Sequence, residues 1–204
     1  MTNDGGRSRG ESTRDQIIDA TLETLKSEGF AGATSRAIAR AGGFNQALVF
    51  YHFGTLDGLL LAALDRTSEE RLARYRQAVV EADTVEELVL LAAQVYEEDR
   101  DRGHMTVVSQ MIAGSVAHPE LAPAMLARME PWIDLCEEAL EKAAAELPAL
   151  ELVPLRELAY AVVTFYLGVN LLTHLDEDRA RTDALFAQLE ALTPFLSSLR
   201  RANE

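Results

Sequence analysis

The chain has 204 residues, of which 48% are hydrophobic and 25% are charged, proportions typical of a soluble globular protein with a sizeable core. Its single cysteine, Cys136, excludes an intrachain disulfide and a cysteine-based zinc site. The net charge of −14 at first argues against a nucleic-acid partner.

The acidic excess is confined to one part of the chain. Residues 1–54 contain six basic and six acidic residues, whereas residues 55–204 contain 13 basic and 27 acidic residues. The stretch from Phe30 to Gly54 contains two arginines and no acidic residue. This asymmetry predicts a small N-terminal binding domain joined to a larger acidic domain.

The N-terminal third of the chain begins with residues 1–11, which are rich in Gly, Ser and Arg and lack an apolar core. We therefore expect a disordered arm rather than a secretory signal, and a cytoplasmic protein. Thr34 or Ser35 and Asn45 are the expected N-caps of two short helices. Apolar periodicity and helix-breaking glycines predict four helices here, over residues 12–29, 35–42, 46–52 and 55–81.

The remaining chain continues as helices separated by capping residues, glycine or proline, with no alternation typical of strands. These helices are expected over residues 84–102, 104–116, 119–147 and 154–175, with a last one after the charged turn at residues 176–179. The predicted fold is all-α. A three-helix helix-turn-helix domain over residues 12–54 is joined by a long helix to a helical ligand-binding and dimerisation bundle within residues 55–204.

The second and third helices, with a tight glycine-containing turn between them, have the proportions of a helix-turn-helix. Their apolar side chains can form one small core and are Ile38, Ala39, Phe44, Leu48, Val49 and Phe53. The third helix then presents an outer edge without acidic residues, which consists of Gln46, Ala47, Tyr51 and His52. Such an edge is typical of a helix that enters the DNA major groove.

The residues of this edge suit particular parts of DNA. Gln46 can pair with an adenine, and Ala47 can contact a thymine methyl group. Hydroxyl and imidazole donors contact phosphates. The candidate DNA-binding residues are Thr34, Ser35, Arg36, Asn45, Gln46, Ala47, Phe50, Tyr51 and His52. Two alternatives stay open, because Phe50 is equally suited to the core and Arg36 to a solvated surface.

Residues 12–64 resemble the DNA-binding domain of the TetR/AcrR family of regulators. The family pattern runs Ile-Ala-x-x-Ala-Gly-Val, then a few polar residues, then Leu-Tyr-x-His-Phe. The matching residues here are Ile38-Ala39, Gly42-Gly43-Phe44 and Val49-Phe50-Tyr51-His52-Phe53. The resemblance implies phosphate contacts from Thr34, Tyr51 and His52, base contacts near Gln46, Ala47 and Phe50, and a homodimer formed by the last two helices.

The chain departs from the family pattern at three positions. Gly42 stands where Ala is usual, and Phe44 where a small β-branched residue is usual. Leu56 stands where a phosphate-binding Lys is usual, which puts one backbone contact per subunit in doubt.

Two features of the C-terminal region predict a homodimer. Residues 158–175 are uncharged and apolar around the whole helix, so one face needs a partner beyond its own domain. The last helix carries leucines at alternating spacings of four and three, typical of a heptad seam. The candidate interface residues are Leu185, Leu189, Leu192 and Leu196. A membrane span is the alternative for residues 158–175, and we expect a soluble helix there and no membrane partner.

The middle helices combine apolar walls with a few aromatic and polar groups, a pattern typical of a small-molecule cavity between helices. The candidate ligand-binding residues are Tyr96, Met111, Trp132, Tyr166 and Asn170. The alternative for each is an ordinary core position. His104 with Asp99 and Asp101 around Gly103 is interpreted as a solvated turn.

The sequence therefore predicts a ligand-responsive transcriptional regulator, a repressor that a small-molecule effector releases from double-stranded operator DNA. The alternatives are a helical interaction scaffold that does not bind DNA and a small helical enzyme. We expect no enzyme, metal or cofactor, because the sequence contains no Glu-x-x-His pair, phosphate-binding glycine loop, nucleophile elbow or His-Glu-x-x-His motif.

Overall fold

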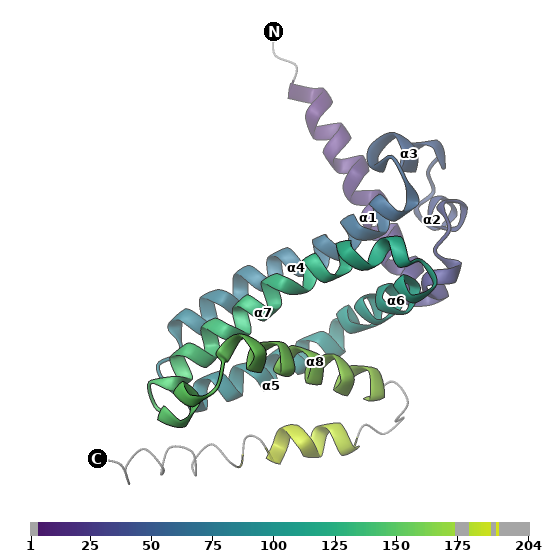
Figure 1. Ribbon diagram of the computed structural model, residues 1–204. Coiled ribbons are helices and arrows are strands. Elements are labelled where there is room, and N and C mark those ends of the chain that lie inside the picture. The colour runs from purple at the N-terminus through teal and green to yellow at the C-terminus, as the bar shows by residue number, and fades with distance from the viewer. Residues whose placement is uncertain (1–3, 174–179, 189–190, 192–204) are drawn as a thin grey trace. The chain divides into compact units, whose positions relative to one another are not determined.

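The computed structural model describes residues 4–173, 180–188 and 191 (Figure 1). No strand occurs in this part of the chain, so the all-α prediction is correct. The helices are α1 (Asp4–Gly32), α2 (Ser35–Gly42), α3 (Ala47–Phe53), α4 (Leu56–Glu81), α5 (Val85–Arg102), α6 (His104–Ala117), α7 (Ala122–Ala144) and α8 (Leu155–Thr173). Two short 3₁₀ segments are η1 (Pro119–Leu121) and η2 (Pro148–Leu152), and residues 180–188 are helical.

The chain forms two compact units, and α4, α6 and α7 each contribute to both. Unit 1 comprises Met1–Glu69 and Thr106–Leu126, and unit 2 comprises Glu70–Met105 and Ala127–Glu204. The division therefore differs from the expected boundary between residues 54 and 55, because the first half of α4 and most of α6 group with the N-terminal helices.

In unit 1 the helices α1, α2 and α3 lie close together (Figure 1), and each of them and α4 contributes to one apolar core. Its buried members are Ile17, Ile18, Ala20, Ile38, Val49, Leu59 and Ala63. The end of α1 also contacts α6, because the Phe30 backbone N–H donates to Gln110 Oε1 at 3.0 Å. These contacts fix the short α2 and α3, which have too few residues to be stable as isolated helices.

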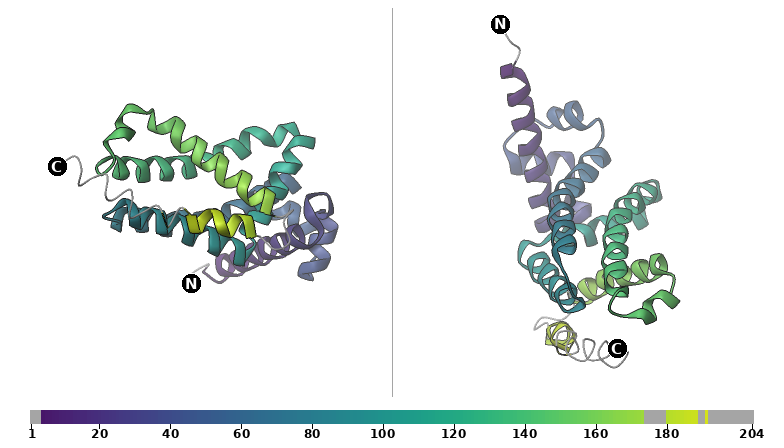
Figure 2. Two further views of the ribbon diagram at one scale, coloured as in Figure 1. Left: turned by 90° about the horizontal axis from the view of Figure 1, so that it is seen from below. Right: turned by 90° about the vertical axis from the view of Figure 1, so that its left-hand side faces the viewer.

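Unit 2 contains the second half of α4 together with α5, most of α7, and α8 (Figure 2). Its apolar core includes Tyr75 and Val79 from α4 and Leu135 from α7, with Leu88 and Leu91 of α5 packed against them. Arg156 connects α8 to α7 through ion pairs with Asp134 and Glu137. The unit is therefore held together by both apolar packing and charged contacts between helices.

The predicted disordered arm over residues 1–11 is wrong for residues 4–11, because α1 begins at Asp4. Packing of the buried Ile17 and Ile18 stabilises the middle of this helix, and adding further turns to an existing helix costs little. The expected end at Gly29 agrees with the structure, in which Gly29 has a non-helical φ of 72° within the assigned α1.

Candidate nucleic-acid interface and buried polar cluster

The two short helices α2 and α3 begin at side-chain caps. Thr34 Oγ1 accepts a hydrogen bond from the Ala37 N–H at 3.2 Å, and Asn45 Oδ1 accepts one from the Ala47 N–H at 2.8 Å. Gly43, with a left-handed φ of 68°, ends α2. Thr34 rather than Ser35 is therefore the N-cap of α2, and Asn45 bonds the first N–H of α3 from the residue before its N-cap, Gln46.

Two of the departures from the family pattern, Gly42 and Phe44, lie next to each other in the turn between α2 and α3. A Cβ atom placed on Gly42 would lie 2.2 Å from the ring of Phe44 and 2.9 Å from the Cβ of Ala20. The Phe44 ring, which packs against the unit 1 core, therefore occupies the space of an alanine methyl group at residue 42. We therefore expect the residues at positions 42 and 44 to be coupled, since an alanine at residue 42 would clash with the Phe44 ring.

The outer edge of α3 is exposed to solvent. Tyr51 is 82% exposed and Phe50 is 47% exposed, whereas Val49 of the same helix is fully buried. The sequence left open whether Phe50 lies in the core or at the surface, and the structure shows that it is a surface residue. The predicted contacts Thr34, Arg36, Asn45 and Ala47 are also exposed, and Ser35, Gln46 and His52 are half-buried.

Two contacts organise this edge. Gln46 Nε2 donates to Ser35 Oγ at 2.8 Å and so connects the beginning of α2 to the residue before α3. The His52 ring lies edge-on to the Tyr51 ring, with 5.0 Å between centroids. On the neighbouring surface, Arg40 pairs with Glu28 at 3.2 Å, which offsets one of the positive charges in the stretch without acids.

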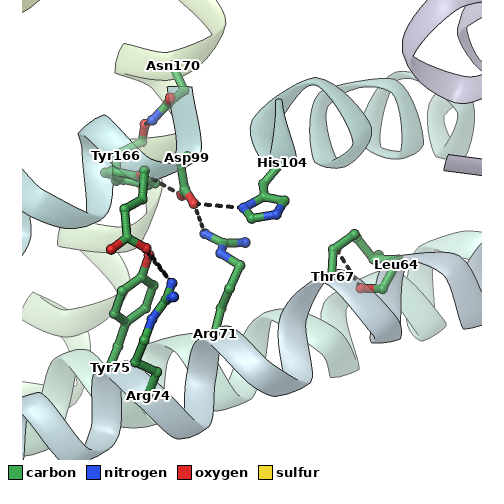
Figure 3. A network of polar contacts seen from close by, with 10 residues as sticks. Leu64, Thr67, Arg71, Arg74, Tyr75, Asp99, His104, Tyr166 and Asn170 are labelled. Atoms are coloured by element: carbon green, nitrogen blue, oxygen red, sulfur yellow. Dashed lines mark hydrogen bonds and ion pairs between the residues drawn. The ribbon is translucent and has the colours of Figure 1, made fainter. Parts of the chain in front are cut away.

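A cluster of polar side chains lies inside unit 2 (Figure 3). Arg71 of α4 and Asp99 of α5 form an ion pair and are 5% and 0% exposed. Asp99 Oδ2 accepts a hydrogen bond from the Tyr166 hydroxyl of α8 at 2.6 Å, and His104 Nδ1 lies 3.4 Å from Asp99 Oδ1. One carboxylate thus joins four segments of the unit.

Aromatic rings and a second ion pair surround this carboxylate. The Arg71 guanidinium carbon lies 4.8 Å from the centroid of the Trp132 ring and 5.9 Å from that of Tyr75. Glu98 pairs with Arg74 and accepts a hydrogen bond from the Tyr75 hydroxyl at 2.9 Å. Each guanidinium is therefore paired with a carboxylate and lies against an aromatic face.

The phenol groups of the polar cluster remain protonated. Burial, followed by the negative charge of Asp99, raises the pKa of Tyr166 well above its usual value. Burial and the hydrogen bond with Glu98 likewise raise the pKa of Tyr75. Tyr166 and Tyr75 accordingly act as hydrogen-bond donors to the two carboxylates.

The five predicted ligand-binding residues do not all lie in one unit. Trp132 and Tyr166 are in the polar cluster, and Asn170 Nδ2 donates to the Tyr166 carbonyl at 2.9 Å. Tyr96 is buried and stacks on Phe186 with 4.3 Å between centroids. Met111 is buried and belongs to unit 1, whereas the other four residues belong to unit 2.

Arg71 was not predicted as a site residue, and Asp99 was predicted only as part of a solvated turn. The interpretation of Asp99 and His104 as a solvated turn is wrong, because Asp99 is fully buried. A signal was available, since Arg71 lies at helical spacing in the buried stripe of α4, which runs Leu60, Leu64, Thr67, Arg71, Tyr75 and Val79.

Helix α8 exposes much of its apolar surface in the single chain. Tyr160, Phe165 and Leu172 are 58%, 56% and 64% exposed. Among the described helices, α8 is the one single helix that is long and apolar enough to span a membrane by length and composition. The bent pair α3 and α4 passes this test only when the two helices are counted as one span. Of the predicted seam, Leu185 is half-buried, and Leu189, Leu192 and Leu196 lie outside the described residues.

The N-terminal helices are similar in sequence to those of known bacterial regulators. Residues 17–63 match the family model for bacterial regulatory proteins of the tetR family. The HTH-type transcriptional regulator BetI of Stenotrophomonas maltophilia (strain R551-3) is 35% identical over 113 residues, which are 53% of this chain and 57% of that protein. UidR of Escherichia coli (strain K12) is 25% identical over 119 residues, 58% of this chain and 60% of that regulator. The chain thus matches little more than half the length of these relatives.

The similarity in fold extends over more of the chain. The transcriptional regulator FadR from Bacillus subtilis, solved in complex with stearoyl-CoA, superposes with a TM-score of 0.71 at 15% identity, covering 91% of this chain and 96% of that one. Fold and exposed edge together define a helix-turn-helix protein with a further helical unit. Residues 17–63 match the TetR family of bacterial regulatory proteins, and the fold of the whole chain is similar to that of solved regulators of this kind.

Proposed function

We propose that this protein is a cytoplasmic, ligand-responsive transcriptional repressor that binds operator DNA as a homodimer and releases it when a small molecule binds. The observation that carries the proposal is the exposed, acid-free edge of α3, with Tyr51 82% exposed, in the segment that matches the family model. The named relatives are transcriptional regulators, which favours this function over the enzyme and scaffold alternatives.

The edge suits DNA in two ways. Ala47 and Phe50 present apolar groups to base edges, and Thr34, Tyr51 and His52 present donors to phosphates. Arg36 and Asn45 lie on the same exposed rim. Gln46 can read an adenine only after its hydrogen bond with Ser35 is exchanged for one with the base, so these two residues act as a pair.

The exposed apolar face of α8 supports the homodimer. Soluble proteins rarely leave large apolar side chains exposed together unless a partner covers them. A two-fold dimer places two recognition helices on DNA, which requires a separation of about 34 Å, one turn of the duplex. Effector binding at the polar cluster, with a coupling of about 1–3 kcal/mol, would weaken operator binding by about 5- to 150-fold.

The test is a fluorescence polarisation titration with a labelled duplex that covers the DNA upstream of the protein's own coding region. Between about 50 and about 200 mM salt, we expect affinity to fall at least about 100-fold, because phosphate contacts release counterions. Tyr51→Ala is expected to weaken binding to specific and unrelated duplexes alike. Binding that is absent or independent of salt would contradict the proposal.

A further inference from the structure

Two buried hydrogen-bond donors in unit 2 take no part in the hydrogen bonds of the polar cluster. Within the described part of the chain, Arg71 Nε and the Tyr96 hydroxyl are buried and have no hydrogen-bond partner. Arg71 is 5% exposed and Tyr96 is 2% exposed. Buried polar groups are nearly always paired, because desolvation without a partner destabilises the fold. This donor pair (Arg71 Nε–H and Tyr96 O–H) therefore points to an acceptor supplied by another molecule.

The donor pair belongs to one neighbourhood of unit 2. Tyr96 and Asp99 lie on the same face of α5, three residues apart, and Asp99 holds the Arg71 guanidinium. The surroundings are apolar and aromatic, since Trp132 lies against Arg71 and Phe186 stacks on Tyr96. A molecule bound by the donor pair would thus contact mostly carbon.

The charges of the polar cluster are already balanced. Arg71 is paired with Asp99 and Arg74 with Glu98, so the formal charges of these four groups cancel. A buried anion would lie close to the Asp99 carboxylate, and the His104 ring, 3.4 Å from Asp99 Oδ1, compensates its charge only when protonated. A cation would meet two guanidiniums that already lie against Trp132 and Tyr75. Both signs of ligand charge are therefore disfavoured.

We propose that the effector of this regulator is uncharged and largely apolar, and that the donor pair binds one of its oxygen atoms. A carbonyl oxygen has two lone pairs and can accept from both donors at once. That the bound molecule acts as an effector rests on the proposed regulator function. Its binding requires only the groups of unit 2.

The experiment uses three six-membered-ring probes that differ in charge: cyclohexanone, cyclohexanecarboxylate and cyclohexylammonium. Trp132 is the only tryptophan of the chain and lies against Arg71, so its fluorescence reports binding directly. We expect cyclohexanone to change the emission saturably, and the two charged probes to bind at least tenfold more weakly. Preference for a charged probe, or no binding of cyclohexanone, would overturn the proposal.

The decisive variant is Tyr96→Phe, which removes only the hydroxyl. We expect it to weaken cyclohexanone binding about tenfold, since one hydrogen bond to the probe is lost. The melting temperature without the probe should stay the same or rise, because the variant removes a buried polar atom that has no partner among the described residues. A structural role would instead lower it. Tyr160→Phe, on the exposed face of α8, is the matched control with unchanged affinity.

Equal affinity of Tyr96→Phe and the unmodified protein, or a lower melting temperature of the variant, would refute the role of the donor pair. A parallel polarisation titration with the upstream duplex separates the two proposals. DNA binding without probe binding would reject the site alone. Probe binding that depends on Tyr96, without DNA binding, would reject the regulator function alone.

Discussion

Leu56 stands at the position where the TetR/AcrR pattern that this chain resembles usually has a phosphate-binding lysine. The side chain begins α4 and packs, partly buried, against the core of unit 1. A lysine there can keep its methylene groups on the same surface while its ammonium group reaches the solvent.

Leu56→Lys is expected to strengthen DNA binding about tenfold at low salt and to steepen the salt dependence by about one released counterion per subunit. The measurement is the slope of log affinity against log salt concentration in the polarisation assay. Leu90→Lys adds the same charge at a 47% exposed position of α5 and serves as control. If both variants change the slope equally, the effect comes from net charge alone, and a lysine at residue 56 does not contact a phosphate.

Cys136 lies half-buried on α7, and burial raises the pKa of its thiol to about 11 from an ordinary value of 9.0. The reactive thiolate is therefore about 100-fold scarcer at neutral pH than for an ordinary cysteine. We expect iodoacetamide to alkylate the folded protein at least that much more slowly than the protein unfolded in guanidinium chloride. Equal rates, followed by mass spectrometry, would show that the thiol is accessible and ionised.

At the scale of the elements, the turn between α2 and α3 depends on a pair of residues. Neither Gly42 nor Phe44 follows the family pattern, and the structure shows that the aromatic ring takes the space of a Cβ atom at residue 42. The two departures from the pattern thus concern residues that compete for the same space in the folded chain.

Gly42→Ala is expected to destabilise the protein by about 1–3 kcal/mol, because the added methyl group overpacks the turn. Phe44→Val should also destabilise it, since it leaves a cavity in the core. In the double variant the new methyl group enters the vacated space, so its loss of stability should be smaller than the sum by about 1 kcal/mol or more. Urea unfolding of the four proteins measures this coupling, and strict additivity would exclude it.

At the scale of the whole molecule, the proposed homodimer is expected to depend on α8. Phe165→Asp places a charge in the apolar face and should weaken association at least 100-fold, because a buried unpaired carboxylate costs several kcal/mol. Sedimentation analysis should then detect monomers. Val80→Asp changes a residue of similar exposure on α4 and should leave the dimer intact. A dimer that survives Phe165→Asp would place the interface elsewhere.

Much of the fold follows from local sequence signals. The caps at Thr34 and Asn45, the breaks at Gly29, Gly43 and Gly54, and the span of α4 are all local effects of side-chain hydrogen bonding and backbone freedom. The helical start at Asp4 was not predicted, because glycine and serine disfavour a helix in isolation and the extension depends on the turns that follow.

The sequence by itself determined the helix-turn-helix and its outward edge, because turn chemistry and apolar periodicity act over a few residues. Only the tertiary structure decided that Arg71 meets Asp99 across 28 positions and that Tyr166 joins them from α8. Charged residues usually lie at the surface, so sequence alone gives no reason to bury these two together. Their pairing depends on which helices pack side by side, and that is a property of the folded chain.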